Sequence, residues 1–416
     1  MRNVLQSVGS RHSSYLQIFS SYLQIFCASA ILISIFSGPA AAEVLKIGVL
    51  GPMSGSAAQW GIELTRGAQM RASEINAAGG IKVGGQSYEI AILPYDHKSE
   101  AAESRTVTNR LIFSDKVKFI VGNAIGATTS AAQTITEPNQ VLFSFISWGA
   151  KNLGPDKPFS FRSDLSGLEV AEPFYAWISE KHPNIKKIAV IGPNDESGRD
   201  SNSVIVNVAK KFGFQVVADE YFVRETKDFY PLLTRILATK PDFIELSNAP
   251  GGTAGLLVKQ LVELGYKGPK GWVGGLNADV LVKIAGKDAA EGTWSPWSLN
   301  YTGPEASPEL RKFVEQYKKQ FNEDPGPSAV ANYIAVDVLA QAIQRTGSVV
   351  DTKAIAERLA GDQFSTMRGP LVVGGQETYG ANRQFLFPVT ITEIKDGKVT
   401  DIDKSLPPEL KKAVAK

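Results

Sequence analysis

Residues that could carry acid–base or metal chemistry are sparse in this chain. Histidine occurs three times and cysteine once, at Cys27, so the chain can form neither a thiolate zinc site nor an internal disulfide. His97 and His182 stand far apart, and no H-E-x-x-H pattern contains either of them. We interpret His97, which follows Asp96 at the end of an expected strand, as a surface turn residue, with a general base as the weaker alternative. No metal or cofactor site is predicted.

Other catalytic and nucleotide-binding motifs are missing from the positions where they could work. Neither G-x-G-x-x-G nor G-x-x-x-x-G-K-[ST] follows an expected strand, which excludes most nucleotide enzymes. The serine in the segment 51–55 (GPMSG) stands one place too late for a nucleophile elbow. Acid pairs at 195–196 and 323–324 lie among loop-forming residues and are expected to be solvated. The sequence therefore favours a binding protein over an enzyme, and an α/β enzyme using His97 is the weaker alternative.

What the chain offers instead is a set of loop tips rich in small and amide residues, each directly after an expected strand. Such tips open helices and present free backbone N–H groups, which suit an anionic or hydrogen-bonding ligand. Aromatic side chains among them would exclude water and stack on the ligand. The six tips cover residues 53–60, 123–129, 147–149, 193–197, 248–252 and 274–277. Together they predict a binding cleft.

The elements that must position these tips alternate between strand and helix. In the first series we expect strands at 45–50, 88–93, 118–121 and 141–145, with helices at 62–77, 101–113 and 128–137. In the second we expect strands at 187–191, 215–222, 243–246 and 271–274, with helices at 201–212, 230–239 and 254–264. Such alternation is typical of mostly parallel sheets flanked by helices. We therefore predict an α/β fold of two lobes, with a cleft between the carboxyl ends of their strands.

The later helices and strands can be assigned to the two lobes as well. We expect the helices at 308–321, 328–346 and 352–360 to return to the first lobe, and the strands at 371–373 and 384–392 to return to the second. The predicted lobes thus comprise residues 43–164 with 294–369, and residues 165–293 with 370–416. Crossings near 163–167, 292–295 and 368–370 would act as the hinge.

The first 42 residues have the features of a secretory leader. Two arginines precede an apolar run from Ile25 to Phe36, and three alanines end at Ala42, the expected cleavage point. The run is shorter than the roughly 20 residues that span a bilayer, and an uncleaved anchor is the alternative. We therefore predict a periplasmic protein. The leader holds two of the 44 basic residues and none of the 42 acids, so the mature chain has no net charge and nucleic acid is not an expected partner.

Several segments carry a recognisable pattern. They are 43–55 (EVLKIGVLGPMSG), 59–61 (QWG), 74–81 (EINAAGGI), 118–122 (KFIVG) and 284–286 (IAG). This pattern resembles periplasmic leucine/isoleucine/valine-type solute-binding proteins of ABC importers, over essentially the whole chain after the leader. The resemblance implies a two-lobed clamshell that traps a small solute and delivers it to an ABC permease in the inner membrane. We expect a monomer, and a ligand-sensing ectodomain of the same fold is the alternative.

The resemblance also bears on the ligand. Amino-acid-binding members offer a serine and a threonine to the ligand carboxylate, and the matching positions here are Gly126 and Gly149. Their second lobe offers carboxylates to the ammonium and a tyrosine beside it, at positions that match near Gly167, Gly274 and Ser197. An ammonium taken out of water without a carboxylate costs several kcal/mol. The missing acids argue against a zwitterion, unless a nearby acid substitutes: Asp164, Asp195 or Glu245.

The predicted site combines both lobes. The first lobe would bind the ligand in the open form through five residues: Asn123, Ile125, Gly126, Ser147 and Gly149. Trp60 matches an aromatic residue that borders the ligand in the family, and Trp148 lies in a loop beside it; two tryptophans would suit a flat or apolar ligand. Ser197 and Asn248 of the second lobe would complete the site. Amino acids and aromatic or aliphatic carboxylates rank as near equals, with amides behind.

Overall fold

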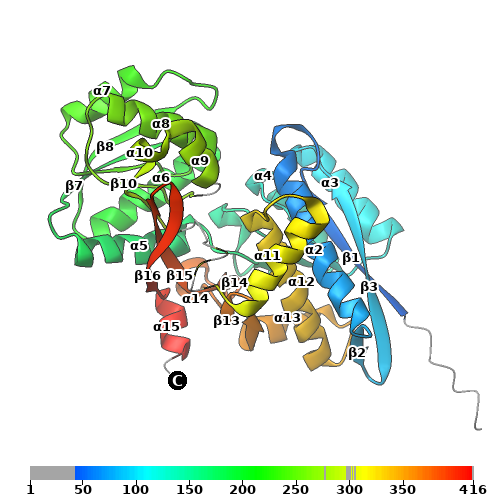
Figure 1. Ribbon diagram of the computed structural model, residues 1–416. Helices are drawn as coiled ribbons and strands as arrows, with labels where there is room; N and C mark the ends of the chain where they lie inside the picture. The colour runs from blue at the N-terminus through cyan, green and yellow to red at the C-terminus, as the bar shows by residue number, and fades with distance from the viewer. Residues whose placement is uncertain (1–42, 276–277, 297–300, 302, 304–305, 415–416) are drawn as a thin grey trace, which may run out of the picture.

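The computed structural model describes residues 43–275, 278–296, 301, 303 and 306–414. The predicted leader over residues 1–42 lies outside this range. Within the described residues no helix is both long enough and apolar enough to cross a membrane. The chain forms two lobes, each a mostly parallel sheet flanked by helices, which confirms the predicted fold class (Figure 1).

The first lobe is built on a nine-stranded sheet in the order β12-β13-β14-β6-β5-β4-β1-β3-β2. The run from β14 to β3 is parallel, and antiparallel pairs close both edges. The central strands are buried on both faces, as their apolar sequences require. The strands are β1 (Glu43–Gly51), β2 (Ile81–Val83), β3 (Gln86–Asp96), β4 (Phe119–Gly122), β5 (Leu142–Phe145), β6 (Ser160–Arg162), β12 (Gln363–Thr366), β13 (Gly369–Gly374) and β14 (Gln384–Leu386).

The second lobe is built on a seven-stranded sheet in the order β16-β15-β11-β10-β9-β7-β8. Five of its strands are parallel, and a hairpin of β15 and β16 is added antiparallel at one edge. The strands are β7 (Lys187–Pro193), β8 (Gln215–Phe222), β9 (Phe243–Glu245), β10 (Lys270–Gly271), β11 (Thr293–Ser295), β15 (Val389–Lys395) and β16 (Lys398–Ser405).

Helices cover the sheets through apolar faces. In α11 (Pro308–Phe321), the buried residues Leu310, Phe313, Val314 and Tyr317 follow the helical spacing, and Ser307 caps the first turn by accepting from Leu310 N–H.

The other helices of the first lobe are α2 (Ala58–Ala77), α3 (Ala101–Asn109), α4 (Gly126–Thr136), α12 (Pro327–Thr346), α13 (Thr352–Gly361) and the short α14 (Gln376–Tyr379). Those of the second are α5 (Gly167–Lys181), α6 (Glu196–Lys211), α7 (Tyr230–Ala238), α8 (Gly251–Glu263), α9 (Ala278–Ala285) and α10 (Lys287–Ala290). Short turns of helix occupy Gly55–Ala57, Arg110–Ser114 and Ala150–Asn152, and α15 (Pro408–Val414) ends the described chain.

The helix α12 is buried around most of its circumference, between other helices of the first lobe and its sheet. It packs against α2 at Gly67, where a Cβ would lie 2.0 Å from the carbonyl oxygen of Ala329. Only glycine lets the two backbones approach this closely. Residues far apart in sequence are thereby joined into one core.

The chain passes between the two sheets at three places. It leaves the first sheet after β6 and returns to it between β11 and α11. The third passage differs from the one predicted at 368–370, because β13 pairs with β14 and β14 pairs with β6 of the first sheet. The change of sheet therefore falls between Leu386 and Val389, and α15 packs back against β13. An apolar run such as that of β13 suits either sheet, so its pattern could not assign it.

A buried ion pair lies at the first passage. Arg368 Nη1 donates to Asp164 Oδ1 at 2.8 Å, and the two side chains are 10% and 6% exposed. The guanidinium also lies 4.4 Å from the ring centroid of Phe387, at the third passage. The pair thus joins two of the connecting segments.

Removal of the Arg368 charge should destabilise the protein strongly. Arg368→Met leaves the Asp164 carboxylate buried without its partner, which costs about 3–5 kcal/mol. The matched control is Arg358→Met, which breaks a half-exposed helical pair with Asp362 at 3.6 Å and should cost about 0.5 kcal/mol or less. Urea unfolding of the three proteins measures both effects; similar losses in the two variants would contradict the assignment.

Candidate functional site

The loops predicted to bind a ligand emerge at the carboxyl edges of the two sheets. Leu50 pairs with Gly122, and Val121 with Ser144, so the loops after β1, β4 and β5 leave the first sheet side by side. In the second sheet, the registers of β7, β9 and β10 align their ends in the same way. Parallel pairing therefore gathers each lobe's tips into one surface.

The loop after β1 is held by Asp96, at the end of the neighbouring β3. The Asp96 carboxylate accepts from the backbone N–H of Met53 at 2.8 Å and of Lys98 at 2.7 Å. Partial burial acts to raise the pKa of this carboxyl, but hydrogen bonds from Ser54, Met53 and Lys98 outweigh it and the pKa lies below its ordinary value. The loop leads into α2, where Trp60 is 38% exposed on the first turn.

His97 is fully buried, so its prediction as a surface turn residue was wrong. Its Nδ1 accepts from Ser99 N–H at 3.1 Å, which leaves Nε2–H to donate to Asn123 Oδ1 at 3.1 Å. The ring is therefore the neutral Nε2–H tautomer, and burial lowers its pKa. Nδ1 thus supports the turn after β3, and Nε2 supports the loop after β4. Sequence position at a strand end gave no sign of this burial.

Asn123 is likewise a buried support at the start of that loop. It adopts a left-handed conformation with φ of 74°, and its Oδ1 accepts from Thr128 Oγ1 at 2.9 Å as well as from His97. Its Nδ2 is buried and has no hydrogen-bond partner among the described residues. The next residue but one, Ile125, is the N-cap of α4 and makes no side-chain cap hydrogen bond.

Gly126 and Gly149, which come from different loops, lie next to each other. A Cβ on either glycine would lie 3.8 Å from the Cα of the other. Gly126 begins α4, so the first N–H groups of that helix and its positive dipole end face this place without a side-chain cap. The structure thus brings together the two positions that the family resemblance connects with a ligand carboxylate.

Asn152 fills the space behind these glycines and was missed in the sequence. Its Nδ2 donates to Ser130 Oγ at 2.8 Å, and its Oδ1 accepts from Ser147 Oγ at 3.2 Å. A Cβ on Gly149 would lie only 2.5 Å from Asn152 Oδ1. Ser147 is 1% exposed and its hydroxyl is directed to Asn152, so its backbone is the part that could meet a ligand.

Arg162, in β6, is a second buried polar residue that was missed. Its Nε donates to the carbonyl oxygen of Ser147 at 2.8 Å and its Nη2 to that of Gly149 at 2.7 Å. The guanidinium is fully buried and places a positive charge directly behind the loop 147–149. The segment 159–161 (FSF) that precedes Arg162 gave no signal of this burial, because the acceptors that satisfy the guanidinium lie elsewhere in the chain.

Trp148 packs toward the first passage between the lobes. A Cβ on Gly167, the first residue of α5, would lie 3.0 Å from Cζ3 of its ring. The residue as a whole is only partly buried. A ligand-facing role for Trp148, as for Trp60, remains a prediction.

In the second lobe, the loops after β9 and β10 meet at Asn248 and Gly274. A Cβ on Gly274 would lie 2.9 Å from Asn248 Cα, and Asn248 is partly exposed. Ser197 is the second residue of α6, and its side chain lies outside the described part of the structure. The contributions of Ser197 and Asn248 to a site therefore stay predictions.

Glu245 joins the same two loops from behind. Its Oε1 accepts from the N–H of Ser247 at 2.9 Å and of Val273 at 2.8 Å, while Tyr175 Oη donates to Oε2 at 3.3 Å. Complete burial raises the pKa of Glu245 to about 7, although the two N–H groups and Tyr175 favour the ionised form. Glu245 is thus a support of the surface and not part of its exposed face.

The other acids that could replace the family's carboxylates are also engaged. Asp164 is buried against Arg368. Asp195 caps α6 by accepting from Gly198 N–H at 2.9 Å and pairs with Arg224. Neither Asp164 nor Glu245 is accessible to a ligand ammonium in this arrangement. Within the described ranges, no three His, Cys, Asp or Glu side chains gather at a point that could hold a metal ion.

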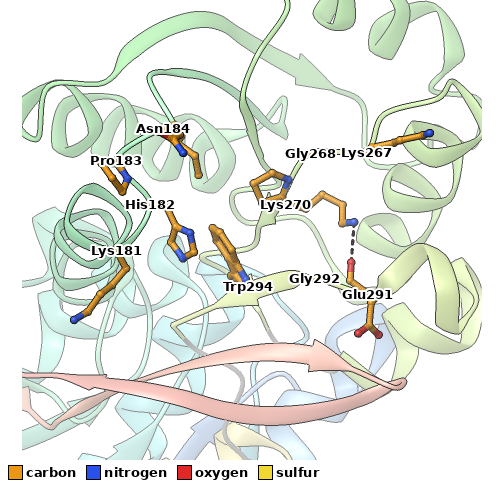
Figure 2. A pocket seen from close by; sticks show the side chains of 12 residues that line it. Lys181, His182, Pro183, Asn184, Lys267, Gly268, Lys270, Glu291, Gly292 and Trp294 are labelled. Carbon is orange, nitrogen blue, oxygen red and sulfur yellow. Dashed lines mark hydrogen bonds between the residues drawn. The ribbon is translucent and has the colours of Figure 1, made fainter.

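A cavity of about 450 Å³ lies at the other edge of the second sheet, among residues that precede or begin its strands (Figure 2). His182 stacks on Trp294 there, with ring centroids 4.3 Å apart. Lys270 Nζ donates to the carbonyl oxygen of Glu291 at 3.0 Å, and burial lowers the pKa of this lysine. Because Lys270 begins β10, the cavity is separate from the loops at the carboxyl ends.

The sequence profile of a family described as periplasmic binding protein matches residues 44–398. The chain belongs to the periplasmic binding protein family. This periplasmic binding protein is 29% identical over 389 residues to the leucine-, isoleucine-, valine-, threonine-, and alanine-binding protein of Pseudomonas aeruginosa, covering 89% of this chain and 98% of that relative. It is 26% identical over 344 residues to the Leu/Ile/Val-binding protein of Escherichia coli, and the match covers 81% of this chain and 88% of that relative. The predicted resemblance is confirmed.

Solved structures show the same fold. A branched-chain amino acid transporter substrate binding protein from Streptococcus pneumoniae, in complex with isoleucine, superimposes with a TM-score of 0.71 at 24% identity over 88% of this chain and 100% of that one. A solute binding protein of an ABC transporter from Rhodopseudomonas palustris, in complex with 3,4-dihydroxy benzoic acid, superimposes with a TM-score of 0.72 at 22% identity. The match covers 88% of this chain and 98% of that one. At these identities the likeness establishes the fold alone.

Substitution of the two adjacent glycines should have opposite effects on stability. Gly126→Ala adds a methyl group whose nearest neighbours lie 3.6 Å away at a helix start, and should stabilise the protein by about 0.5–1 kcal/mol. Gly149→Ala displaces Asn152 from its hydrogen bonds and should destabilise it by about 1–3 kcal/mol. Urea unfolding compares them; effects of the same sign would contradict the packing described for Asn152.

Glu245 should make stability fall as the pH rises. Its pKa is about 7 in the folded protein and near its ordinary 4.5 in the unfolded chain, so the folded state binds the extra proton between these values. The contribution of Glu245 to the free energy of unfolding is complete below about pH 4.5 and is lost by about pH 7. The change amounts to about 3 kcal/mol. Glu245→Gln keeps Oε1 as acceptor and mimics the neutral acid. Urea unfolding at pH 5 and pH 8 should show that the variant is more stable relative to the parent at pH 8 than at pH 5. A difference in stability between the two proteins that does not change with pH would contradict this.

Proposed function

We propose that this periplasmic binding protein traps a small carboxylic acid between its lobes and delivers it to an ABC permease. The proposal includes export to the periplasm after loss of the leader, action as a monomer, and no catalytic step. The named relatives bind branched-chain amino acids, and the two structures cited above hold isoleucine and an aromatic acid. Both ligand kinds carry a carboxylate.

The observation that carries this proposal is the arrangement around Gly126 and Gly149. The uncapped start of α4 offers backbone N–H groups there, and no side chain stands on either glycine. Arg162, behind the adjoining loop, adds a buried positive charge. Backbone donors, a helix dipole and a buried cation all favour a negative group at this point. The mature chain has no net charge, so these local groups must attract the anion.

The second lobe favours a ligand without an ammonium group. The three acids named as possible substitutes for the family's carboxylates, Asp164, Asp195 and Glu245, are buried or already paired. An unpaired ammonium would be costly in a closed cleft. We therefore rank aromatic or aliphatic carboxylates first and branched-chain amino acids second. Trp60, exposed at the start of α2, would cover the apolar part of either ligand.

A thermal-shift screen tests the ligand class. Probes are benzoate, 4-hydroxybenzoate, 3,4-dihydroxybenzoate, L-leucine, L-isoleucine and benzamide, the last as the neutral partner of benzoate. A ligand that binds only the folded state stabilises it by about 2.7 kcal/mol at 100 times its dissociation constant. We expect a carboxylate to shift the melting temperature and benzamide not to. Equal shifts by benzoate and benzamide, or no shift by any carboxylate, would overturn the proposal.

Trp60→Ala tests the position of the cleft with the carboxylate found in that screen. Loss of stacking and apolar contact should weaken binding about tenfold or more, or about 1.4 kcal/mol. The control is Phe113→Ala, which removes another exposed aromatic side chain, 52% accessible, from the segment that leads into the amino end of β4. Titration calorimetry measures both. Unchanged affinity in Trp60→Ala would remove this residue from the site.

A further inference from the structure

Arg162 connects the ligand-facing loop 147–149 to a different part of the first lobe. Besides the two carbonyl oxygens of that loop, its Nη1 donates to Tyr379 Oη at 2.9 Å and to Gln384 Oε1 at 2.9 Å. Four hydrogen bonds thus run from one buried guanidinium to neutral acceptors. The planar group with fixed donor directions can hold these partners in one geometry, which a lysine could not do.

The contact with Tyr379 continues into the second lobe. Tyr379 Oη donates to Glu169 Oε1 at 2.7 Å, and Glu169 Oε2 accepts from Ser166 N–H at 2.8 Å in the capping box of α5. Burial, together with the neighbouring Glu169, raises the pKa of Tyr379, so the phenol keeps its proton as a donor. Tyr379 belongs to α14, between two strands of the first sheet, whereas α5 packs against α6 and the β15–β16 hairpin. The phenol–carboxylate bond therefore crosses from one lobe to the other.

A second contact joins the same two places. The Trp148 ring, in the middle of the loop, lies against the first residue of α5 at Gly167. The loop is thus linked to the first turn of α5 once through a ring contact and once through the series Arg162, Tyr379 and Glu169. Both links lie beside the first passage between the sheets, where a hinge motion would change the position of α5 relative to the loop.

We infer that Arg162 is a positioning residue that couples the loop 147–149 to the first turn of α5, so that the ligand surface and the relative position of the lobes depend on each other. The inference rests on the proposed function for its consequence in ligand binding, but the coupling itself is a property of the protein without ligand. In the described part of the chain, Glu169 makes no hydrogen bond to a residue of the loop; its hydrogen-bonded link to the loop runs through Tyr379 and Arg162, and it also caps the turn of α5 that the Trp148 ring contacts.

Amide hydrogen exchange of the ligand-free, full-length mature protein tests the coupling. Tyr379→Phe removes the phenol oxygen and Glu169→Ala removes its acceptor. Each should accelerate exchange at least about fivefold in two segments together, residues 147–153 and residues 166–171, because each breaks the series between them.

The matched controls come from a Tyr–Glu pair inside the first lobe. Tyr333 Oη donates to Glu74 Oε2, and both residues lie on helices of that lobe, α12 and α2. Tyr333→Phe and Glu74→Ala should leave both segments as in the parent. Acceleration confined to residues 376–379 in Tyr379→Phe, an unchanged loop in Glu169→Ala, or equal acceleration in the control pair would overturn the inference.

A binding measurement separates this inference from the proposed function. With benzoate and L-isoleucine as probes, Tyr379→Phe should weaken binding at least about tenfold relative to Tyr333→Phe. If the parent binds neither these probes nor the other carboxylates of the screen, the proposed function is wrong. The coupling is then decided by the hydrogen-exchange measurement alone. If the parent binds a probe and Tyr379→Phe binds it equally well, the consequence drawn for ligand binding is wrong.

Discussion

The predicted ligand surface depends on the buried guanidinium of Arg162. A charge removed from water is tolerated only when its donors are satisfied, and here the acceptors come from the loop 147–149, from Tyr379 and from Gln384. Gln384 lies in β14, so this strand has to run beside β6 for the guanidinium to be satisfied. The late return of the chain to the first sheet and the shape of the loop thus both supply acceptors to the same guanidinium.

Other loops of the surface are supported in the same manner, by a polar side chain placed behind them. Asp96 holds the loop after β1, the His97–Asn123 pair holds the loop after β4, and Glu245 joins the loops after β9 and β10. Buried polar groups of this kind rigidify a surface because each fixes the direction of its partners. The exposed side is left to backbone groups, glycines and a few larger side chains. On the proposed function, such a surface would select a ligand mainly by shape and by the sign of its charge.

Much of the architecture followed from local patterns. The helix expected at 308–321 was found with the same bounds, because apolar spacing, a serine cap and a proline at the first position all agree there. The strands β2, β6, β11, β12 and β16 were not predicted; four of them have only three or four residues, too few to show a clear periodic pattern. The strand β13 was assigned to the wrong sheet, and so was β14, which was expected as part of one strand over 384–392. The apolar residues of β13 suit any sheet interior, and only its pairing with β14 determines where it lies.

The sequence by itself determined the fold class, the family and the edge of each sheet on which the loops emerge, because strand–helix alternation and the opening motif are local properties. Only the tertiary structure decided which polar side chains face that surface and which support it from behind. Arg162 and its acceptors Tyr379 and Gln384 are 217 and 222 residues apart in the chain. His97, Asn152 and Glu245 are likewise buried by elements that local sequence does not reveal. Burial and hydrogen-bond partners at such separations arise only when distant strands pair, so no local pattern could have assigned these roles.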